Sequence, residues 1–419
     1  MSRGIQCFEV VISGASFAGL ALARGLTQAL GPDLRIALID HDANLSPAAD
    51  DGRAFAIWAG GQAVLESLGV WETIAPHAET LTAIEISDSA LDDGVRQTRV
   101  TYDAQTSGGK PACHIVPSFV LQNALMDALS PWGEGASSKS SITWFAPAEA
   151  AHFSLGDVLA EVHLSDGRVL ASSLVVAAEG RHSKLRDAAG IKTMGWSYEQ
   201  TGIVATVAFE LPHGGIAIQH FLPGGPFAIL PLRGNKACIT WSAAQKDAER
   251  IIALNDAAFL AELDERIGGR FGTLALAGPR RSWPLDLKLA RDLTAKRFAV
   301  IGDAAHGVHP VAGQGVNLAL RDVAALVECV TDAARLGFDP GHGAALEKYA
   351  RWRRFDSTMS ASLYEGINRV FSIDNTVMRA GRGAAMGILD TLPALKTMII
   401  DEAAGVTGDL PKMLKGEGV

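Results

Sequence analysis

A block of small residues and histidines in the last third of the chain has the composition of a ligand-binding loop. Residues 302–317 read GDAAHGVHPVAGQGVN, and the apolar run RFAVIG stands directly before the aspartate. This run predicts a buried strand, which would deliver Asp303 to the carboxyl end of a sheet. Ligands bind at that edge in open α/β folds, so we expect a ligand site around Asp303.

A long helix is expected after this block. Apolar residues stand at positions 316, 320, 323, 327 and 330, which is the spacing of one helical face. Arg321 and Asp322 fall on the other face. Because the helix would begin just after Gly315, its unpaired N–H groups would point back at the loop and favour a ligand edge that becomes anionic.

A second glycine-bearing turn lies near the start of the chain. Residues 14–19 read GASFAG, which matches the dinucleotide-binding pattern GxGxxG except that Ser16 replaces the middle glycine. Gly14 permits a tight turn, a small Ser16 lets the backbone approach a pyrophosphate, and Gly19 lets helix and strand pack closely. Asp40 ends the next apolar run, where a carboxylate accepts ribose hydroxyls. The pattern predicts a dinucleotide site formed by Gly14, Ser16, Phe17, Ala18, Gly19 and Asp40.

The elements that would position these residues follow from the hydrophobic pattern. Strand-like runs at 8–13 and 34–40 flank a helical stretch, which predicts a βαβ unit with a parallel sheet. Residues 200–245 contain several strands of a largely antiparallel sheet. Further expectations are buried strands at 174–180 and 297–303, a hairpin turning at Asp166 and Gly167, and helices at 119–132, near 247–267 and after 343.

Composition and charge exclude several classes of protein. The chain has 419 residues, a net charge of −9 and 48% hydrophobic residues, so it is globular, has room for two to three domains and lacks the basic face of a nucleic-acid binder. Its four cysteines are too dispersed for a zinc or iron–sulfur site, which predicts no metal and free, buried thiols. Without a signal peptide or a membrane-spanning run, we expect a cytoplasmic protein, with peripheral contact at the inner membrane left open.

The motifs together resemble the flavin-dependent aromatic hydroxylases of the p-hydroxybenzoate hydroxylase class. The segment GDAAHGVHPVAGQGVNLALRDV, with GASFAG and Asp40, carries the resemblance. Its form HPxAGQGxNLxLRDV is similar in particular to the hydroxylases of ubiquinone biosynthesis that act on 2-polyprenylphenols. The segments GRAFAIWAGGQAVLESLGVW, FVLQNALMDAL, FLPGGPFAILPL, RSWPLDL and GVTGDLPKMLKG extend the likeness over nearly the whole chain.

The resemblance implies an α/β fold with three regions. A Rossmann-like FAD-binding domain with a parallel sheet would comprise 1–75, 101–186 and 285–343. An inserted, mostly antiparallel β-sheet domain for the substrate would comprise 76–100 and 187–284. C-terminal helices would fill 344–419.

The resemblance also assigns residues to the cofactor. Asp303 would bind the ribityl chain of FAD, and Arg53 and Gln122 would contact its pyrophosphate and ribityl region. Glu179 opens a third motif, EGRHSKLR, where the class has Asp-Gly. That motif serves FAD and pyridine nucleotide in the family, so a nucleotide groove is expected near Glu179 and Arg186, and the change leaves the electron donor open. The other cofactor residues implied are Gly302, Pro310, Gly313, Gly315, Val316 and Asn317.

The chemistry implied is ring hydroxylation through a flavin C4a-hydroperoxide. It would use non-covalent FAD, O2 and NAD(P)H as a transient co-substrate or another electron donor. Pro310 would shape the oxygen-reaction side, and His306 and His309 are candidates for proton relay. The pocket-wall candidates on the inserted sheet, for which plain core packing is the alternative, are Phe221, Phe227, Leu230, Pro231 and Trp241.

Other functions remain open at this point. A flavin reductase of prenyl double bonds shares the fold, and a flavin-bearing scaffold in a quinone-synthesis complex would have no turnover of its own. A halogenase is disfavoured because the sequence lacks WxWxIP. The expected substrate is a prenylated aromatic molecule. The apolar segment 380–400 is either a hairpin packed on the cofactor domain or a surface for a partner enzyme, a lipid-binding protein or the bilayer.

Overall fold

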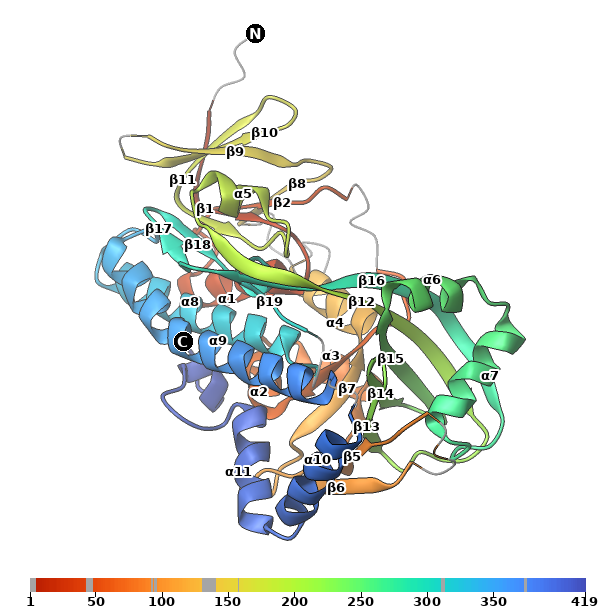
Figure 1. Cartoon of the computed structure of the whole chain (residues 1–419). Helices are drawn as coiled ribbons and strands as arrows, with labels where there is room; N and C mark the ends of the chain where they lie inside the picture. The colour runs from red at the N-terminus through yellow and green to blue at the C-terminus, as the bar shows by residue number, and fades with distance from the viewer. Residues whose placement is uncertain are drawn as a thin grey trace.

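The computed structural model describes residues 5–42, 48–91, 93, 96–129, 141–156, 158–309, 313–372 and 375–419, and these form three β-sheets with helices packed around them (Figure 1). The first sheet is parallel at its centre, in the order β18-β11-β1-β2-β8. These strands are β1 (Gln6–Ser13), β2 (Ile36–Ile39), β8 (Ile142–Phe145), β11 (Val169–Ala177) and β18 (Phe298–Val300). Antiparallel β9 (Ala150–Leu155), β10 (Ala160–Leu164) and β17 (Thr294–Ala295) extend it.

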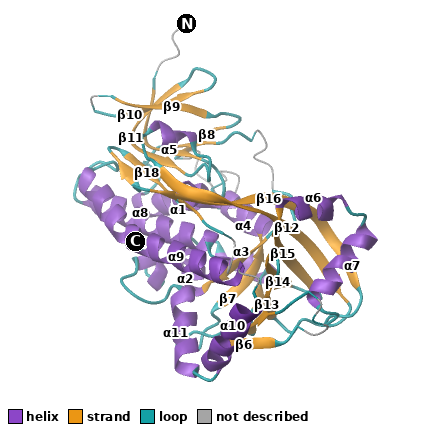
Figure 2. Ribbon diagram, viewed as in Figure 1, coloured by secondary structure: helices purple, strands orange, loops and turns teal. Residues whose placement is uncertain are grey.

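The parallel strands are apolar throughout because helices cover the sheet. Figures 1 and 2 show α1, α8 and α9 as a layer beneath it. These helices are α1 (Phe17–Leu30), α8 (Gly315–Arg335) and α9 (Gly343–Ser372), and the shorter α4 (Ser118–Asp127) packs against α1. Helices α1 and α8 approach closely at Gly25, where a Cβ would lie 2.8 Å from a methyl carbon of Val327.

The second sheet is mostly antiparallel, in the order β19-β16-β12-β15-β14-β13-β5-β6. Its strands are β5 (Ala83–Asp88), β6 (Thr98–Asp103), β12 (Thr193–Phe209), β13 (Ile216–Leu222), β14 (Gly225–Leu232), β15 (Lys236–Ala244), β16 (Leu274–Ala290) and β19 (His306–Gly307). The helices α6 (Gln245–Ala253) and α7 (Asp256–Ile267) lie along this sheet (Figure 1). Long β12 and β16 carry the sheet to the loop after β18, where β19 pairs with β16.

A small third sheet packs against β14 of the second sheet, and the last two helices pack on β5 and β6 (Figure 1). The sheet contains β3 (Ala54–Trp58), β7 (Cys113–Pro117) and β4 (Glu79–Thr80). The remaining helices are α2 (Ala59–Ser67), α3 (Trp71–Ile74), α5 (Lys184–Ala188), α10 (Thr376–Asp390) and α11 (Pro393–Ala404), with short 3-10 turns at Ala75–His77, Gly302–Ala304 and Lys412–Lys415. A buried ion pair between Arg382 and Asp88, 2.7 Å apart, fastens α10 to β5.

The α/β class with an inserted antiparallel sheet is confirmed. The proposed domain limits cut across this topology at three places. β6 crosses the expected boundary at residue 100 because it pairs with β5, β16 crosses the expected boundary at residue 285, and β19 joins the second sheet. The expectation of buried thiols is wrong for Cys7, which is exposed. Among the described residues, no single helix is both long and apolar enough to cross a membrane.

Candidate functional site

The predicted motifs meet at one edge of the parallel sheet. The strands β1, β2, β11 and β18 run in the same direction, and each ends just before one of Gly14, Asp40, Glu179 and Gly302. The loops that follow them therefore share the carboxyl edge, which is where open α/β sheets bind their ligands.

The first turn has no room for side chains at its two glycines. Gly14 has φ +108°, and a Cβ there would lie 2.3 Å from the carbonyl oxygen of Ala178. A Cβ on Gly19 would lie 1.9 Å from the carbonyl oxygen of Gly14. Ser16 is exposed at the N-cap of α1, and its hydroxyl makes no capping bond to the described part of that helix. With no acidic residue in its first turn, α1 presents N–H groups that suit an anion.

Asp40 and Gln122 come together on the same residue of this turn. The Asp40 carboxylate accepts a hydrogen bond from the backbone N–H of Ala15, with a donor–acceptor distance of 2.7 Å. The Gln122 side chain donates to the carbonyl of Ala15 at 2.8 Å. Both side chains therefore stabilise the conformation of the turn through its backbone. Their predicted contacts with the cofactor stay a proposal.

Arg53 lies at the start of β3, next to α4. Its guanidinium pairs with Asp51 at 2.6 Å and lies over the ring of Trp283, 5.4 Å from the ring centre. Asp51 also accepts from the hydroxyl of Ser118, the first residue of α4. Because Gln122 lies one turn further along the same helix, Arg53 and Gln122 flank one corner of the carboxyl edge.

The loop after β18 is fixed where α1 and α8 cross. Gly302 has φ +59°, and a Cβ there would lie 3.3 Å from the Cβ of Ala18 in α1 and 3.4 Å from that of Ala319 in α8. The Asp303 side chain is 37% exposed. A Cβ on Gly315 would lie 3.9 Å from Oδ1 of Asp303, so this carboxylate stands beside the N-terminus of α8. That helix has no acidic residue in its first turn either.

Asn317 holds β3 against α8. Its Oδ1 accepts from the backbone N–H of Trp58 at 3.0 Å, and its Nδ2 donates to the carbonyl of Ala56 at 2.7 Å. Gly313 lies at the same contact, where its own Cβ would be 3.0 Å from that of Ala56. Val316 is buried. The Asn317 side chain thus positions the loop. Of the predicted contact between Asn317 and the cofactor, we therefore retain only the part made by the backbone.

Glu179 and Arg186 are engaged within the protein. Glu179 accepts from the hydroxyls of Ser13 and Ser183, at 2.7 and 2.6 Å, and so ties the turn before α5 to the end of β1. Arg186 has no exposed surface, and its guanidinium donates to the carbonyls of Arg181 and Ala304. Arg186 cannot contact a nucleotide in the expected groove, because its guanidinium is fully buried. The groove near Glu179 stays a prediction.

Asp322 is a site residue that the sequence analysis missed. It was expected off the buried face of α8, yet its side chain is fully buried. Its carboxylate accepts from the backbone N–H of Gly302 at 2.9 Å and pairs with Arg353 of α9 at 2.7 Å. Burial alone would raise the pKa of Asp322, but His306 and Arg353 lower it overall. Helical periodicity gives no signal for this burial, because Asp322 lies off the apolar stripe of α8 and is covered by contacts with Arg353 and His306.

The placement of His306 follows from this cluster. His306 is 1% exposed and its Nε2 lies 2.6 Å from the Asp322 carboxylate. It therefore belongs to the support of the Gly302 turn, and we withdraw it as a candidate for proton relay. Pro310 lies outside the described residues.

His309 is neutral at neutral pH. Burial, and secondarily the charge of Arg181, lowers the pKa of His309 to about 4. The Tyr198 ring meets it edge-on with 5.0 Å between ring centres. A neutral imidazole can orient a hydrogen bond, but it does not carry the extra proton that a general acid at neutral pH requires.

The lowered pKa predicts acid-sensitive stability. An unfolded histidine takes up a proton near pH 6.5, whereas folded His309 does so only near pH 4. The stability that the neutral His309 contributes to the fold is complete above pH 6.5 and is lost as the pH falls towards 4. We expect His309→Asn to reduce the loss of unfolding free energy between pH 7 and 4.5 by about 2–3 kcal/mol. Urea unfolding of both proteins at the two pH values measures it, and parallel pH dependences would contradict it.

The five expected pocket-wall residues lie on two faces of the second sheet. Because side chains alternate along β13 and β14, Phe221 and Leu230 face the small third sheet and α10. The Phe221 ring stacks on that of Phe371 in α9, with ring centres 3.8 Å apart. Phe227 and Trp241 belong to the core cluster that includes Phe259 of α7. Pro231, opposite Ala237, is on that same face. We therefore withdraw Phe227, Pro231 and Trp241 as pocket walls.

Comparison with known proteins adds independent findings. The sequence profile described as FAD binding domain matches residues 7–349. The ubiquinone hydroxylase UbiL of Rhodospirillum rubrum is 34% identical over 415 residues, which cover 97% of this chain and 92% of the relative. The 3-demethoxyubiquinol 3-hydroxylase of Escherichia coli is 30% identical, with 96% and 99% covered.

A solved structure supports the fold. The p-nitrophenol 4-monooxygenase PnpA of Pseudomonas putida superposes with a TM-score of 0.77 at 17% identity, covering 96% of this chain and 100% of that one. At this identity the likeness concerns the architecture alone.

Proposed function

Because the chain belongs to the FAD-binding-domain family, we propose that it hydroxylates the aromatic ring of a prenylated phenol or quinone precursor in ubiquinone biosynthesis. The chain is an FAD-dependent monooxygenase of the hydroxylase type. The proposal for the substrate is carried by its 34% identity, over nearly the full length of both chains, with a ubiquinone hydroxylase.

The residues at the carboxyl edge fit FAD. The N-termini of α1 and α8 have no acidic residue in their first turns, so their N–H groups can meet a pyrophosphate and an electron-rich ring edge. The turn glycines Gly14 and Gly313 let the two loops pack closely against Ala178 and Ala56. Two carboxylates suited to hydroxyl groups, Asp40 and Asp303, stand at the same edge. Reduced FAD supplies the activation of O2 when it is bound.

We assign the following work to the protein itself. Asp303 binds the ribityl hydroxyls, and the start of α8 stabilises negative charge on the adjacent ring edge. Neutral His309 orients a hydrogen bond beside the same loop. NAD(P)H serves as a transient co-substrate. Since no cysteine or histidine of the sequence stands in an evident flavin-attachment motif, heat or acid should release FAD intact.

We place the substrate ring over the face of the second sheet that carries Phe221 and Leu230. That face borders an apolar cluster which includes Ala56 and Trp58 of β3. Gly313 of the cofactor loop packs against the Cβ of Ala56, so the cluster adjoins the proposed flavin position. The apolar side chains of this cluster would exclude water from the reaction.

The two alternative functions predict different products in cells. Deletion of the gene should cause accumulation of a prenylated precursor that lacks one ring oxygen. Loss of a reductase would instead leave the ring complete and the prenyl tail too unsaturated. If the protein were a scaffold without turnover, a variant whose flavin cannot be reduced would still restore quinone synthesis in the deletion strain. Quinone-intermediate profiling of the deletion strain distinguishes these outcomes.

We also propose that the helix pair α10–α11 makes the peripheral membrane contact through which a prenylated substrate is reached. The two helices meet at a bend of 97°, and together they satisfy the length and composition of a broken membrane span. Ile388 is 64% exposed and Met398 59% exposed. The charges between them are neutralised, since Lys396 pairs with Asp390 at 2.9 Å.

Acidic substitutions on this pair should weaken membrane contact only. We expect the double variant Ile388→Glu, Met398→Glu to lose most of its co-flotation with phospholipid vesicles while its FAD content and melting temperature stay unchanged. The matched control is Val158→Glu, because Val158 is 69% exposed and lies in the turn between β9 and β10. Equal flotation of the double variant and the wild type, or no flotation of either, would refute the contact.

A further inference from the structure

Arg181, a residue of the EGRHSKLR motif to which the sequence analysis gave no role, lies between the cofactor loop and the second sheet. Its Nε donates to Oδ2 of Asp303 at 3.2 Å. Its Nη1 donates to the side chain and to the carbonyl of Asp286, at 2.7 and 3.0 Å, and its Nη2 donates to the carbonyl of Val308 at 2.9 Å. One guanidinium thus joins the turn after β18, the strand β16 and the loop that leads from β19 towards α8.

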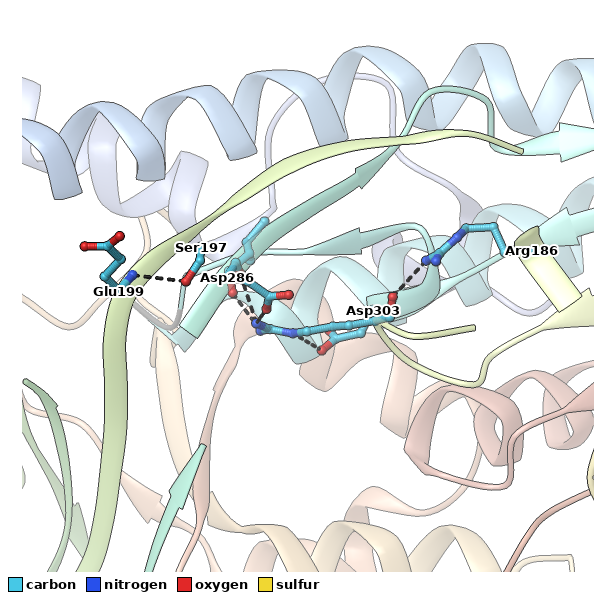
Figure 3. Close-up of polar contacts among 7 residues, drawn as sticks. Arg186, Ser197, Glu199, Asp286 and Asp303 are labelled. Atoms are coloured by element: carbon cyan, nitrogen blue, oxygen red, sulfur yellow. Dashed lines mark hydrogen bonds and ion pairs between the residues drawn. The ribbon is translucent and has the colours of Figure 1, made fainter. Parts of the chain in front are cut away.

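The stem of Arg181 is held as firmly as its head group. A Cβ on Gly307 would lie 2.8 Å from Cγ of Arg181, so the stem packs directly on the backbone of β19. The carbonyl of Arg181 accepts from Arg186, which also donates to the carbonyl of Ala304. In Figure 3, dashed lines mark the contacts of Asp286, Asp303 and Arg186 within this cluster.

The charges of the cluster favour this arrangement. Burial would lower the pKa of Arg181, but the two carboxylates of Asp303 and Asp286 raise it overall. Planar guanidinium groups suit several directed hydrogen bonds at once. Since Arg181 takes Oδ2 of Asp303, Oδ1 is left on the side of Gly315 and the start of α8.

The sheet residue in the cluster lies at an irregularity of the sheet. Asp286 pairs with Ser197 of β12, directly before a bulge between Ser197 and Gln200. Glu199 in this bulge has φ +54°, which is unusual for a residue other than glycine, and its N–H bonds to the hydroxyl of Ser197 (Figure 3). Bulges of this kind re-aim side chains next to functional sites.

We propose that Arg181 is a positioning residue: it orients the Asp303 carboxylate for FAD and, through Asp286, makes the affinity for FAD depend on the second sheet. The main support for this proposal is that one guanidinium binds both Asp303, on the cofactor side, and Asp286, on the second sheet. Asp286 itself then needs no contact with FAD in order to influence its binding.

The test measures FAD affinity directly, by titrating apoprotein with FAD and following flavin fluorescence. Arg181→Gln should weaken FAD binding about tenfold or more, because it removes a charge-assisted hydrogen bond to Asp303. Asp286→Asn should weaken it by a smaller factor, and Arg181→Lys should restore part of the loss. The double variant Arg181→Gln, Asp286→Asn should bind FAD no more weakly than Arg181→Gln alone, since Asp286 acts through Arg181.

The matched control removes the carboxylate partner of another arginine, which lies on β16. Arg280 of β16 pairs with Asp256 at 3.0 Å, away from the cofactor loop, so Asp256→Asn should leave FAD affinity unchanged. Wild-type affinity in Asp286→Asn would overturn the proposal even if Arg181→Gln failed to fold. It would also be overturned if the Arg181→Gln apoprotein melted earlier while FAD still bound with wild-type affinity, because that is the result of a general structural role.

Discussion

Asp303→Ala should lower the affinity for FAD about a hundredfold or more. The carboxylate stands at the carboxyl edge of the parallel sheet, and its Oδ1 is directed to the N-terminal end of α8. Its replacement would remove at least two charge-assisted hydrogen bonds to ribityl hydroxyls, each worth about 1.5–3 kcal/mol. It would also leave Arg181 with Asp286 as its remaining carboxylate partner.

The ratio of flavin to protein absorbance in the purified variant measures this loss, and titration of the apoprotein gives the affinity. Asp303→Asn keeps a hydrogen-bond acceptor but loses the charge, so its FAD affinity should lie between those of Asp303→Ala and the wild type. Asp292→Ala is the control, because this carboxylate pairs with Arg354 on the surface at 3.1 Å and both side chains are 62% exposed. Full flavin occupancy in Asp303→Ala would remove Asp303 from the site.

Of these substitutions, Asp322→Ala should lower the free energy of unfolding the most. Its carboxylate is fully buried between Arg353 and His306 and accepts the N–H of Gly302. Removal would leave a buried guanidinium without its main counter-charge, which typically costs about 3–5 kcal/mol. Because the same carboxylate fixes the turn before Asp303, FAD retention should fall together with stability.

The control for this variant joins the same two helices. Asp332 of α8 pairs with Lys348 of α9 at 2.9 Å, but their side chains are 39% and 41% exposed. Exposed pairs contribute about 0–1 kcal/mol, so Asp332→Ala should be nearly neutral in urea unfolding. If the two alanine variants lose equal stability, Asp322 is an ordinary ion pair and not the support of the turn.

The sequence predicted the parts of the site that depend on local patterns. Gly14 and Gly19 could be assigned because a turn between strand and helix requires them, and the structure shows the backbone contacts that a side chain would break. The start of α8 near Gly315 followed from helical periodicity. Asp40 and Asp303 were expected after buried strands, and both stand at the carboxyl edge.

The contacts between distant segments could not be predicted in this way. Asp322 looked exposed because helical periodicity marks one apolar face and says nothing of Arg353 on α9. The sequence alone grouped Phe221 with Trp241 as pocket walls, and only the packing of α7 shows that the face carrying Trp241 is core. The cluster around Arg181 joins residues 105 and 122 positions apart in sequence, and no local signal announces it.

The most direct test of the hydroxylase assignment is the fate of molecular oxygen. Purified holoenzyme, reduced by NAD(P)H, should be given a prenylated phenol precursor of ubiquinone under oxygen-18 gas, and the product analysed by mass spectrometry. We expect one oxygen-18 atom on the aromatic ring of each product molecule and the second atom in water. An unlabelled product, a product changed only by two added hydrogen atoms, or release of peroxide with the substrate intact would contradict it.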